Sequence, residues 1–190
     1  ALETALRRAG SAVAEPPPPV RALVYLGEIG ALGKMDELGA AHELVGHAAR
    51  DGRAFLEAYE TGMSQVGDRL AVTGFERPPF RTRAEEGLVG GTRFAREVAR
   101  AAFEQGVVVR AVVCAGEGAV YDDASRRAAL ASPAMVRAAE LLAVIRQGPA
   151  VPTIAVNGVT GLLLELLQQR LAEWELDPEG PSGCAVWRLT

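Results

Sequence analysis

Residues 22–34 read ALVYLGEIGALGK, an apolar run followed directly by a glycine-rich turn. The apolar run predicts a buried strand, and the glycines predict that this strand ends and a helix begins. Lys34, the only lysine in the chain, closes the turn. Because lysine carries a compact charge whose pKa shifts readily on burial, its position between a strand and a helix suits contact with an anion.

Short apolar runs and longer helical patterns alternate along the rest of the chain. The predicted strands are 20–26, 69–73, 107–114, 151–156 and 184–189. The predicted helices are 35–50, 52–63, 92–105, 133–147 and 159–174. This alternation predicts an α/β fold, a three-layer domain with a mostly parallel central sheet of about five strands. The last strand mixes in a charge at Arg188 and is a candidate edge strand.

The N-terminal region has a different composition from the remainder. Residues 2–14 have helical composition, and Pro16 to Pro19 form a stiff polyproline spacer. We therefore expect an N-terminal helical arm and spacer over 1–19 and a single α/β domain over 20–190, a length that suits one domain.

The bulk composition narrows the classes of function. The net charge is -4 and 5% of the residues are aromatic, which argues against nucleic acid as a partner. No apolar stretch approaches the ~20 residues that span a bilayer, so no membrane partner is expected. The two cysteines, Cys114 and Cys184, lie in apolar runs and are expected to be small buried side chains. A cytoplasmic location follows as the simplest expectation.

The familiar cofactor motifs do not fit. A phosphate-binding P-loop would need glycine at position 28 and a hydroxyl at position 35, where the chain has Glu28 and Met35. The glycine spacing is not the dinucleotide fingerprint either, so no nucleoside triphosphate or dinucleotide is predicted. His42 and His47 are five residues apart, which places them on different faces of a helix and predicts no zinc site.

Four glycine-containing segments follow strands and precede helical patterns: 27–34, 74–83, 115–123 and 157–161. In an open parallel sheet such segments gather at one edge and bind ligands there. The candidate substrate-binding residues are Arg77, Arg81, Arg83, Asn157 and Thr160. The arginines match carboxylates or phosphates, although ion pairs with neighbouring glutamates would explain them equally well, and Thr160 would also serve as a helix cap.

The segment 115–123 is the most acidic of the four. Glu117 lies between two glycines at a strand end and is the candidate general acid or base, with Lys34 as the second catalytic candidate. Magnesium is possible, with Glu117, Asp122 and Asp123 as its ligands. One of the two aspartates would otherwise cap the next helix.

Two functions remain open at this point. The first is an enzyme that acts on a small phosphorylated or carboxylated metabolite by acid/base chemistry, with lyase, isomerase, transferase and hydrolase not distinguished. The second is a non-catalytic, oligomeric protein that binds a small ligand. The leucine-rich segment 159–174 predicts either a buried helix or a subunit interface, and a homo-oligomer is expected.

Overall fold

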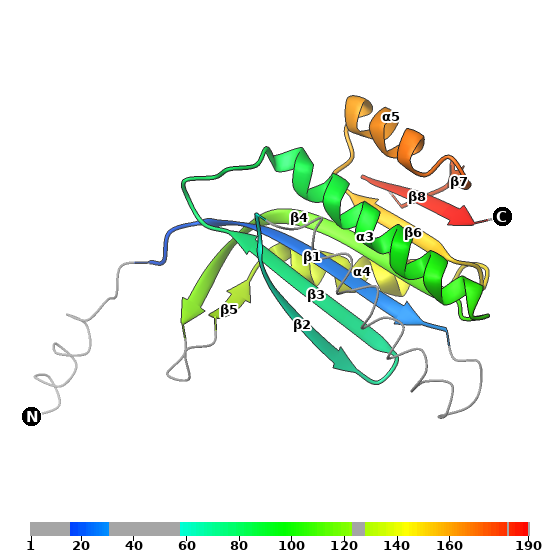
Figure 1. The fold of residues 1–190 in the computed structure, drawn as a ribbon, viewed down its shortest axis with the longest axis horizontal. Helices are drawn as coiled ribbons and strands as arrows, with labels where there is room; N and C mark the ends of the chain where they lie inside the picture. The colour runs from blue at the N-terminus through cyan, green and yellow to red at the C-terminus, as the bar shows by residue number, and fades with distance from the viewer. Residues whose placement is uncertain (1–15, 31–57, 123–127, 182, 190) are drawn as a thin grey trace, which may run out of the picture.

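The computed structural model describes residues 16–30, 58–122, 128–181 and 183–189 (Figure 1). Its strands are β1 (Val20–Ile29), β2 (Glu60–Val66), β3 (Arg69–Glu76), β4 (Val109–Asp122), β5 (Ala128–Ala131), β6 (Thr153–Asn157), β7 (Trp174–Asp177) and β8 (Cys184–Leu189). Its helices are α3 (Ala84–Glu104), α4 (Pro133–Ile145) and α5 (Gly161–Arg170). Residues 1–15 of the predicted arm and spacer (1–19), together with the predicted helix at 35–50, lie outside the described residues.

The strands form one mixed sheet in the order β2-β3-β1-β4-β6-β8-β7, with β5 added to the far half of β4. Within the described ranges, β4 and β6 are the one parallel pair, and every other pair is antiparallel. The predicted mostly parallel sheet of about five strands is therefore wrong, and the last strand, β8, lies between β6 and β7 and not at an edge. The five predicted strands are all present, but apolar runs do not reveal the direction in which a strand enters the sheet.

The first half of the sheet is antiparallel because β2 and β3 form a hairpin. Val66 pairs with Arg69, which leaves Gly67 and Asp68 as a two-residue turn. Gly67 has a φ of 60°, the left-handed conformation that such tight hairpin turns require. The segment 52–63, predicted as a helix, runs into β2 from Glu60 onward, and its residues 52–57 lie outside the described part of the chain.

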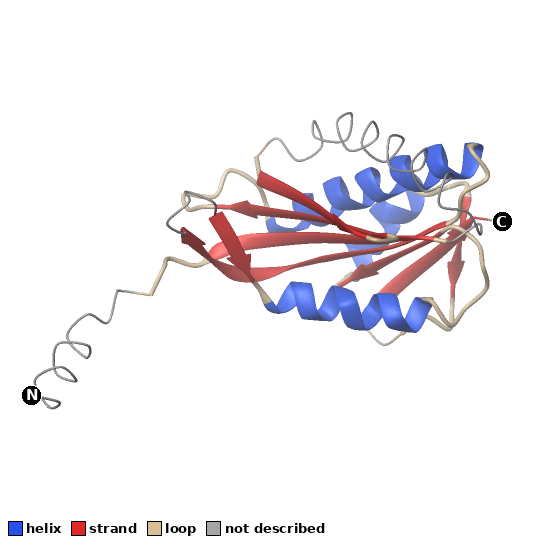
Figure 2. Cartoon of the chain, turned by 90° about the horizontal axis from the view of Figure 1, so that it is seen from below, coloured by secondary structure: helices blue, strands red, loops and turns tan. Residues whose placement is uncertain are grey.

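Helices cover both faces of the sheet (Figure 2). On one face, called here the α3 face, α3 and α5 pack over Leu23, Val113 and Ile154. On the other, the α4 face, α4 packs over the neighbouring positions Val24 and Val112. Strands buried on both sides explain the near-continuous β-branched sequence of β4.

The helix boundaries follow local chemistry. Ser132 caps α4, as its position before Pro133 predicts, and its hydroxyl accepts a hydrogen bond from the Ala134 amide at 3.2 Å. The leucine-rich helix α5 is shorter than predicted, because Trp174 already begins β7. None of the described helices is long and apolar enough to cross a membrane.

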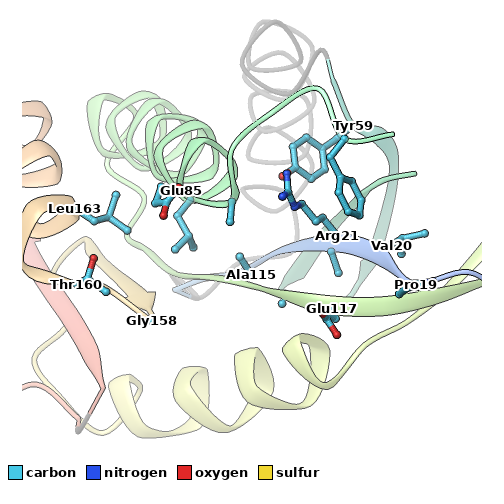
Figure 3. Close-up of a pocket in the computed structure, with 15 residues that line it drawn as sticks. Pro19, Val20, Arg21, Tyr59, Glu85, Ala115, Glu117, Gly158, Thr160 and Leu163 are labelled. Carbon is cyan, nitrogen blue, oxygen red and sulfur yellow. The ribbon is translucent and has the colours of Figure 1, made fainter. Parts of the chain in front are cut away.

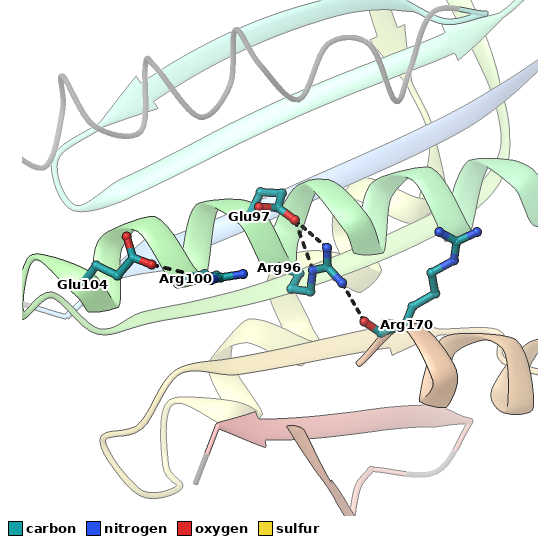
Figure 4. Close-up of polar contacts among 5 residues, drawn as sticks. All are labelled: Arg96, Glu97, Arg100, Glu104 and Arg170. Atoms are coloured by element: carbon teal, nitrogen blue, oxygen red, sulfur yellow. Dashed lines mark hydrogen bonds and ion pairs between the residues drawn. The ribbon is translucent and has the colours of Figure 1, made fainter. Parts of the chain in front are cut away.

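Arginine side chains join α3 to α5 (Figure 4). Arg96 donates to the Arg170 carbonyl oxygen at 2.7 Å and pairs with Glu97 at 2.6 Å. Arg100 pairs with Glu104 at 3.3 Å, one turn along the same helix, and both side chains are exposed. The first contact fixes the end of α5 against α3, whereas the second is a solvent-exposed pair of small energetic weight.

Candidate functional site

Three of the four predicted ligand segments meet at one end of the sheet. Phe80, Gly116, Gly158 and Thr160 line a common cavity on the α3 face. The described part of the first segment, 27–30, lies elsewhere, because Arg21 pairs with Glu117 near the start of β1 whereas Glu28 pairs with Arg110 near its end. At 3.4 Å per residue these two positions are about 24 Å apart. Because neighbouring strands run in opposite directions here, their carboxyl ends lie at two opposite ends of the sheet.

Glu117, the predicted acid or base, is exposed near the cavity. Its carbonyl oxygen accepts a hydrogen bond from the Ser132 hydroxyl at 2.7 Å. Figure 3 shows its carboxylate on the side of β4 away from Arg21. Thr160 is the N-cap residue of α5, but its side chain makes no capping hydrogen bond, and Asn157 is the half-buried last residue of β6.

The three predicted arginines of the β3–α3 loop are exposed and occupy different surroundings. Arg77 pairs with Glu60 at 3.2 Å and lies 5.2 Å from the centre of the Phe75 ring. Arg81 donates its backbone amide to Glu76, and Arg83 is the N-cap residue of α3. The structural alternative for this loop was pairing of its arginines with Glu85 and Glu86, and the partner of Arg77 is instead Glu60 of β2.

The remaining predicted positions lie partly outside the described residues. Lys34, Asp123 and both histidines fall in the undescribed segments, and Asp122 is the last residue of β4. Among the described residues no group of three metal-ligating side chains comes together. The roles predicted for Lys34, Glu117 and the two aspartates therefore stay predictions.

Glu76, which sequence reasoning missed, is 4% exposed and is surrounded by donors. Its carboxylate accepts from the Arg81 and Thr82 amides and, at 2.6 Å, from the Thr82 hydroxyl, and Arg21 lies 3.9 Å away. Burial alone would raise the pKa of Glu76, but these hydrogen bonds and the Arg21 charge lower it below its usual value. The carboxylate thereby holds the β3–α3 loop against the sheet.

Glu28 is the second buried carboxylate, 5% exposed, at the opposite end of β1 on the α4 face. Arg146, just after α4, lies 3.1 Å from one carboxylate oxygen, and Arg69 of β3 lies 3.6 Å from the other. Arg110 is its cross-strand neighbour on β4 and donates to the Gly148 and Pro149 carbonyl oxygens. We call Glu28, Arg69, Arg110 and Arg146 the arginine cluster. Its members are far apart in the sequence, so no local motif predicts it.

Both cysteines are free thiols; Cys114 is buried, as predicted, whereas Cys184 is half-buried. Burial raises the pKa of Cys114 to about 12 and that of Cys184 to about 11. A thiol with so high a pKa is a poor nucleophile at neutral pH, so these side chains act as small apolar groups.

The comparisons with known proteins concern the fold. No family model and no curated protein matches the sequence. Solved structures do match. The fold is that of nucleotide cyclase domains.

Three of the matching structures illustrate the likeness. A bacterial light-regulated adenylyl cyclase aligns with a TM-score of 0.55 at 15% identity, over 92% of both chains. The guanylyl cyclase domain of the RhoGC fusion protein from the fungus Blastocladiella emersonii has a TM-score of 0.59 at 10% identity, over 92% of this chain and 97% of that one. The guanylate cyclase domain of RhGC from Catenaria anguillulae, solved in complex with GTP, has a TM-score of 0.56 at 10% identity, over 90% of this chain and 96% of that one.

These matches correct the cofactor prediction. The absence of a P-loop and of a dinucleotide fingerprint was taken to exclude nucleoside triphosphates, and that exclusion is wrong. A domain with this same fold was solved with GTP bound. A glycine motif identifies only those folds that hold phosphates on a glycine-rich turn, so its absence does not exclude other nucleotide-binding folds.

Proposed function

We propose that this chain is a nucleotide-binding domain of the cyclase type, whose ligand is a purine nucleoside triphosphate and whose reaction is its cyclisation. The observation that carries the proposal is the agreement of the fold with adenylyl and guanylyl cyclase domains over at least 90% of both chains in the three comparisons above. A fold alone does not establish a reaction, so the proposal also needs a place for the phosphates.

The arginine cluster supplies that place. Glu28 engages Arg69 and Arg146 through their Nε atoms. The Arg69 and Arg146 side chains are 48% and 46% exposed, so they lie where an anion can approach them. Planar guanidinium groups bind phosphate oxygens through pairs of hydrogen bonds. The buried carboxylate thus orients two phosphate-binding side chains without using all of their donors.

The charge of the cluster favours an anion as well. Arg69, Arg110 and Arg146 carry three positive charges, against the negative charges of Glu28 and of Asp68, whose carbonyl oxygen accepts a hydrogen bond from the Ile29 amide at 2.8 Å. The Arg110 Nε and one Glu28 carboxylate oxygen are buried without a hydrogen-bond partner. A phosphate group would add acceptors where the donors are in excess.

A second candidate function is nucleotide binding without turnover, and the contacts of the Glu28 carboxylate favour it. Magnesium prefers carboxylate oxygens, and catalysis on triphosphates uses the metal to neutralise developing charge. Both oxygens of Glu28 already face guanidinium groups. The Glu28 carboxylate by itself is therefore a poor fit for a magnesium ion.

A homodimer is part of the proposal. A guanylyl cyclase domain of the RhoGC protein was solved as a non-canonical dimer, and the same domain was also solved as a monomer. Light scattering of the purified chain with and without GTP would test assembly. A larger mass with GTP supports nucleotide-linked dimerisation, and an unchanged monomer contradicts it.

Two measurements on the purified chain separate the candidate functions. A fluorescent N-methylanthraniloyl derivative of GTP or ATP reports binding, and mass spectrometry after incubation with magnesium or manganese reports cyclic nucleotide. Binding together with product supports the cyclase. Binding without product supports the non-catalytic domain, and the lack of binding by either nucleotide contradicts both.

A further inference from the structure

A cavity of about 500 Å³ opens on the α3 face, at the opposite end of β1 from Glu28. β1, β4, the loop before α3, the first turns of α3, and the turn before α5 surround it (Figure 3). Its volume lies within the range of pockets that hold small molecules. None of the residues that line it belongs to the arginine cluster, so it is a separate site.

Most of the wall is apolar. The aliphatic residues that line the cavity include Val20, Ala22, Leu88, Ala115 and Leu163. They come from four elements that are distant in the sequence, and they meet only because α3 and α5 pack on the same face. An apolar molecule that enters the cavity gains by leaving water.

Two aromatic rings and one guanidinium group form the remaining wall. Tyr59 and Phe80 both line the cavity. The Arg21 guanidinium lies over the Phe80 ring, 4.1 Å from its centre. Planar groups stacked in this way favour a planar partner, because rings and guanidinium groups attract one another face to face.

This wall is fixed before any ligand arrives. Arg21 donates to the Thr82 carbonyl oxygen, and Glu76 holds the amide of the same residue. Tyr59 packs against two glycines, since a Cβ on Gly74 would lie 3.3 Å from the Tyr59 Cβ and a Cβ on Gly87 would lie 2.5 Å from its hydroxyl. A preformed wall loses little conformational entropy on binding.

The charges around the cavity balance to exclude an anionic ligand. Arg21 is the one cation among the described lining residues, and Glu76 lies 3.9 Å from it. Glu85 is exposed on the first turn of α3 and also lines the cavity. The third acid, Glu117, turns its carboxylate away (Figure 3). No positive charge remains uncompensated, in contrast to the arginine cluster.

We infer that this cavity binds a small, neutral, planar aromatic molecule, at a site distinct from the one proposed for the nucleotide. The ring of the ligand lies among Leu88, Leu163 and the aromatic wall. The inference goes beyond the proposed function and does not depend on nucleotide binding.

A fluorescence titration with the neutral probe N-phenylnaphthylamine tests the inference, with anionic anilinonaphthalene sulfonate as the comparison. We expect saturable binding of the neutral probe at one site and at least tenfold weaker binding of the sulfonate. Excess GTP leaves the probe in place. Stronger binding of the sulfonate overturns the ligand class, and displacement by GTP overturns the separateness of the site.

Matched variants locate the probe. Ala115→Phe fills the cavity and abolishes binding, whereas Ala139→Phe, at an exposed position of α4, leaves it unchanged. Equal probe affinity in the Ala115 variant and the wild type contradicts the site, as does equal loss in both variants. If Ala115→Phe does not fold, Phe80→Leu takes its place. That change removes one planar wall and weakens binding about tenfold, and unchanged affinity contradicts the inference.

Discussion

Glu76 and Glu28 are both buried glutamates at opposite ends of the same strand pair, yet their partners differ. Backbone amides and a threonine hydroxyl surround Glu76. Half-exposed arginine side chains from two elements surround Glu28. The amides belong to the fold and cannot turn to a ligand, whereas the arginines retain accessible donors. The comparison shows that burial of a carboxylate does not by itself indicate a binding site. Partner side chains that keep hydrogen-bond donors available to a ligand do indicate one.

The largest expected effect is a difference in the free energy of unfolding between variants of the two carboxylates. Glu76→Gln places an amide group against donors that need a charged acceptor, so we expect the free energy of unfolding to fall by about 3 kcal/mol. Glu28→Gln removes a buried charge whose arginines can return to water, so we expect a change within about 1 kcal/mol. Urea unfolding of both variants measures the difference. Equal losses would remove the distinction.

The pH dependence of unfolding sharpens the same comparison. The pKa of Glu76 is lower in the folded chain than in the unfolded one. Its contribution is therefore complete above the unfolded pKa, near pH 4, and is lost as the pH falls through the lower folded pKa. We expect the wild type to lose more stability than Glu76→Gln when unfolding is measured from about pH 5 down to about pH 3. Parallel curves would show that Glu76 is not the group responsible.

A smaller effect concerns the cavity wall. Gly87→Ala forces the Tyr59 ring to move, and we expect a loss of about 1 kcal/mol together with weaker binding of N-phenylnaphthylamine. Gly91→Ala is the control, because its Cβ would meet Val113 and Leu23 in the core instead. The control is expected to lose stability and keep the probe. Thermal melting and probe titration of both variants check this, and an unchanged probe affinity in Gly87→Ala would contradict a fixed wall.

Much of the secondary structure follows from the sequence. The β-branched run in β4 and the Ser132 cap of α4 act locally, so both are predictable. The direction of the strands depends on distant pairings such as Val24 with Thr73, which periodicity does not encode. The strand β7 is hidden for a related reason, because its Trp174 continues an apolar pattern that reads as helix.

The site residues, too, divide into those that the sequence predicts and those that only the fold brings together. Glycine-rich strand ends predicted that 74–83, 115–123 and 157–161 carry ligand contacts, and described parts of all three line one cavity. No local sequence pattern identifies Arg21 or Tyr59 as cavity residues. The contacts that hold each side chain at the cavity include a residue more than 20 positions away, as Thr82 is for Arg21. In the sequence, Glu28 stands out only as the residue at a position where a P-loop would need glycine. Its role with Arg69 and Arg146 follows from the register of β1 with β3 and from the end of α4.

The most direct measurement is a titration of fluorescent GTP against Arg146→Gln and its control Arg100→Gln. Arg146 borders Glu28, whereas Arg100 forms an exposed pair with Glu104 on α3. Loss of a charge-assisted phosphate contact costs about 1.5–3 kcal/mol, so affinity should fall at least tenfold in the first variant and stay unchanged in the second. Equal affinity in both variants and the wild type would contradict the arginine cluster as the nucleotide site.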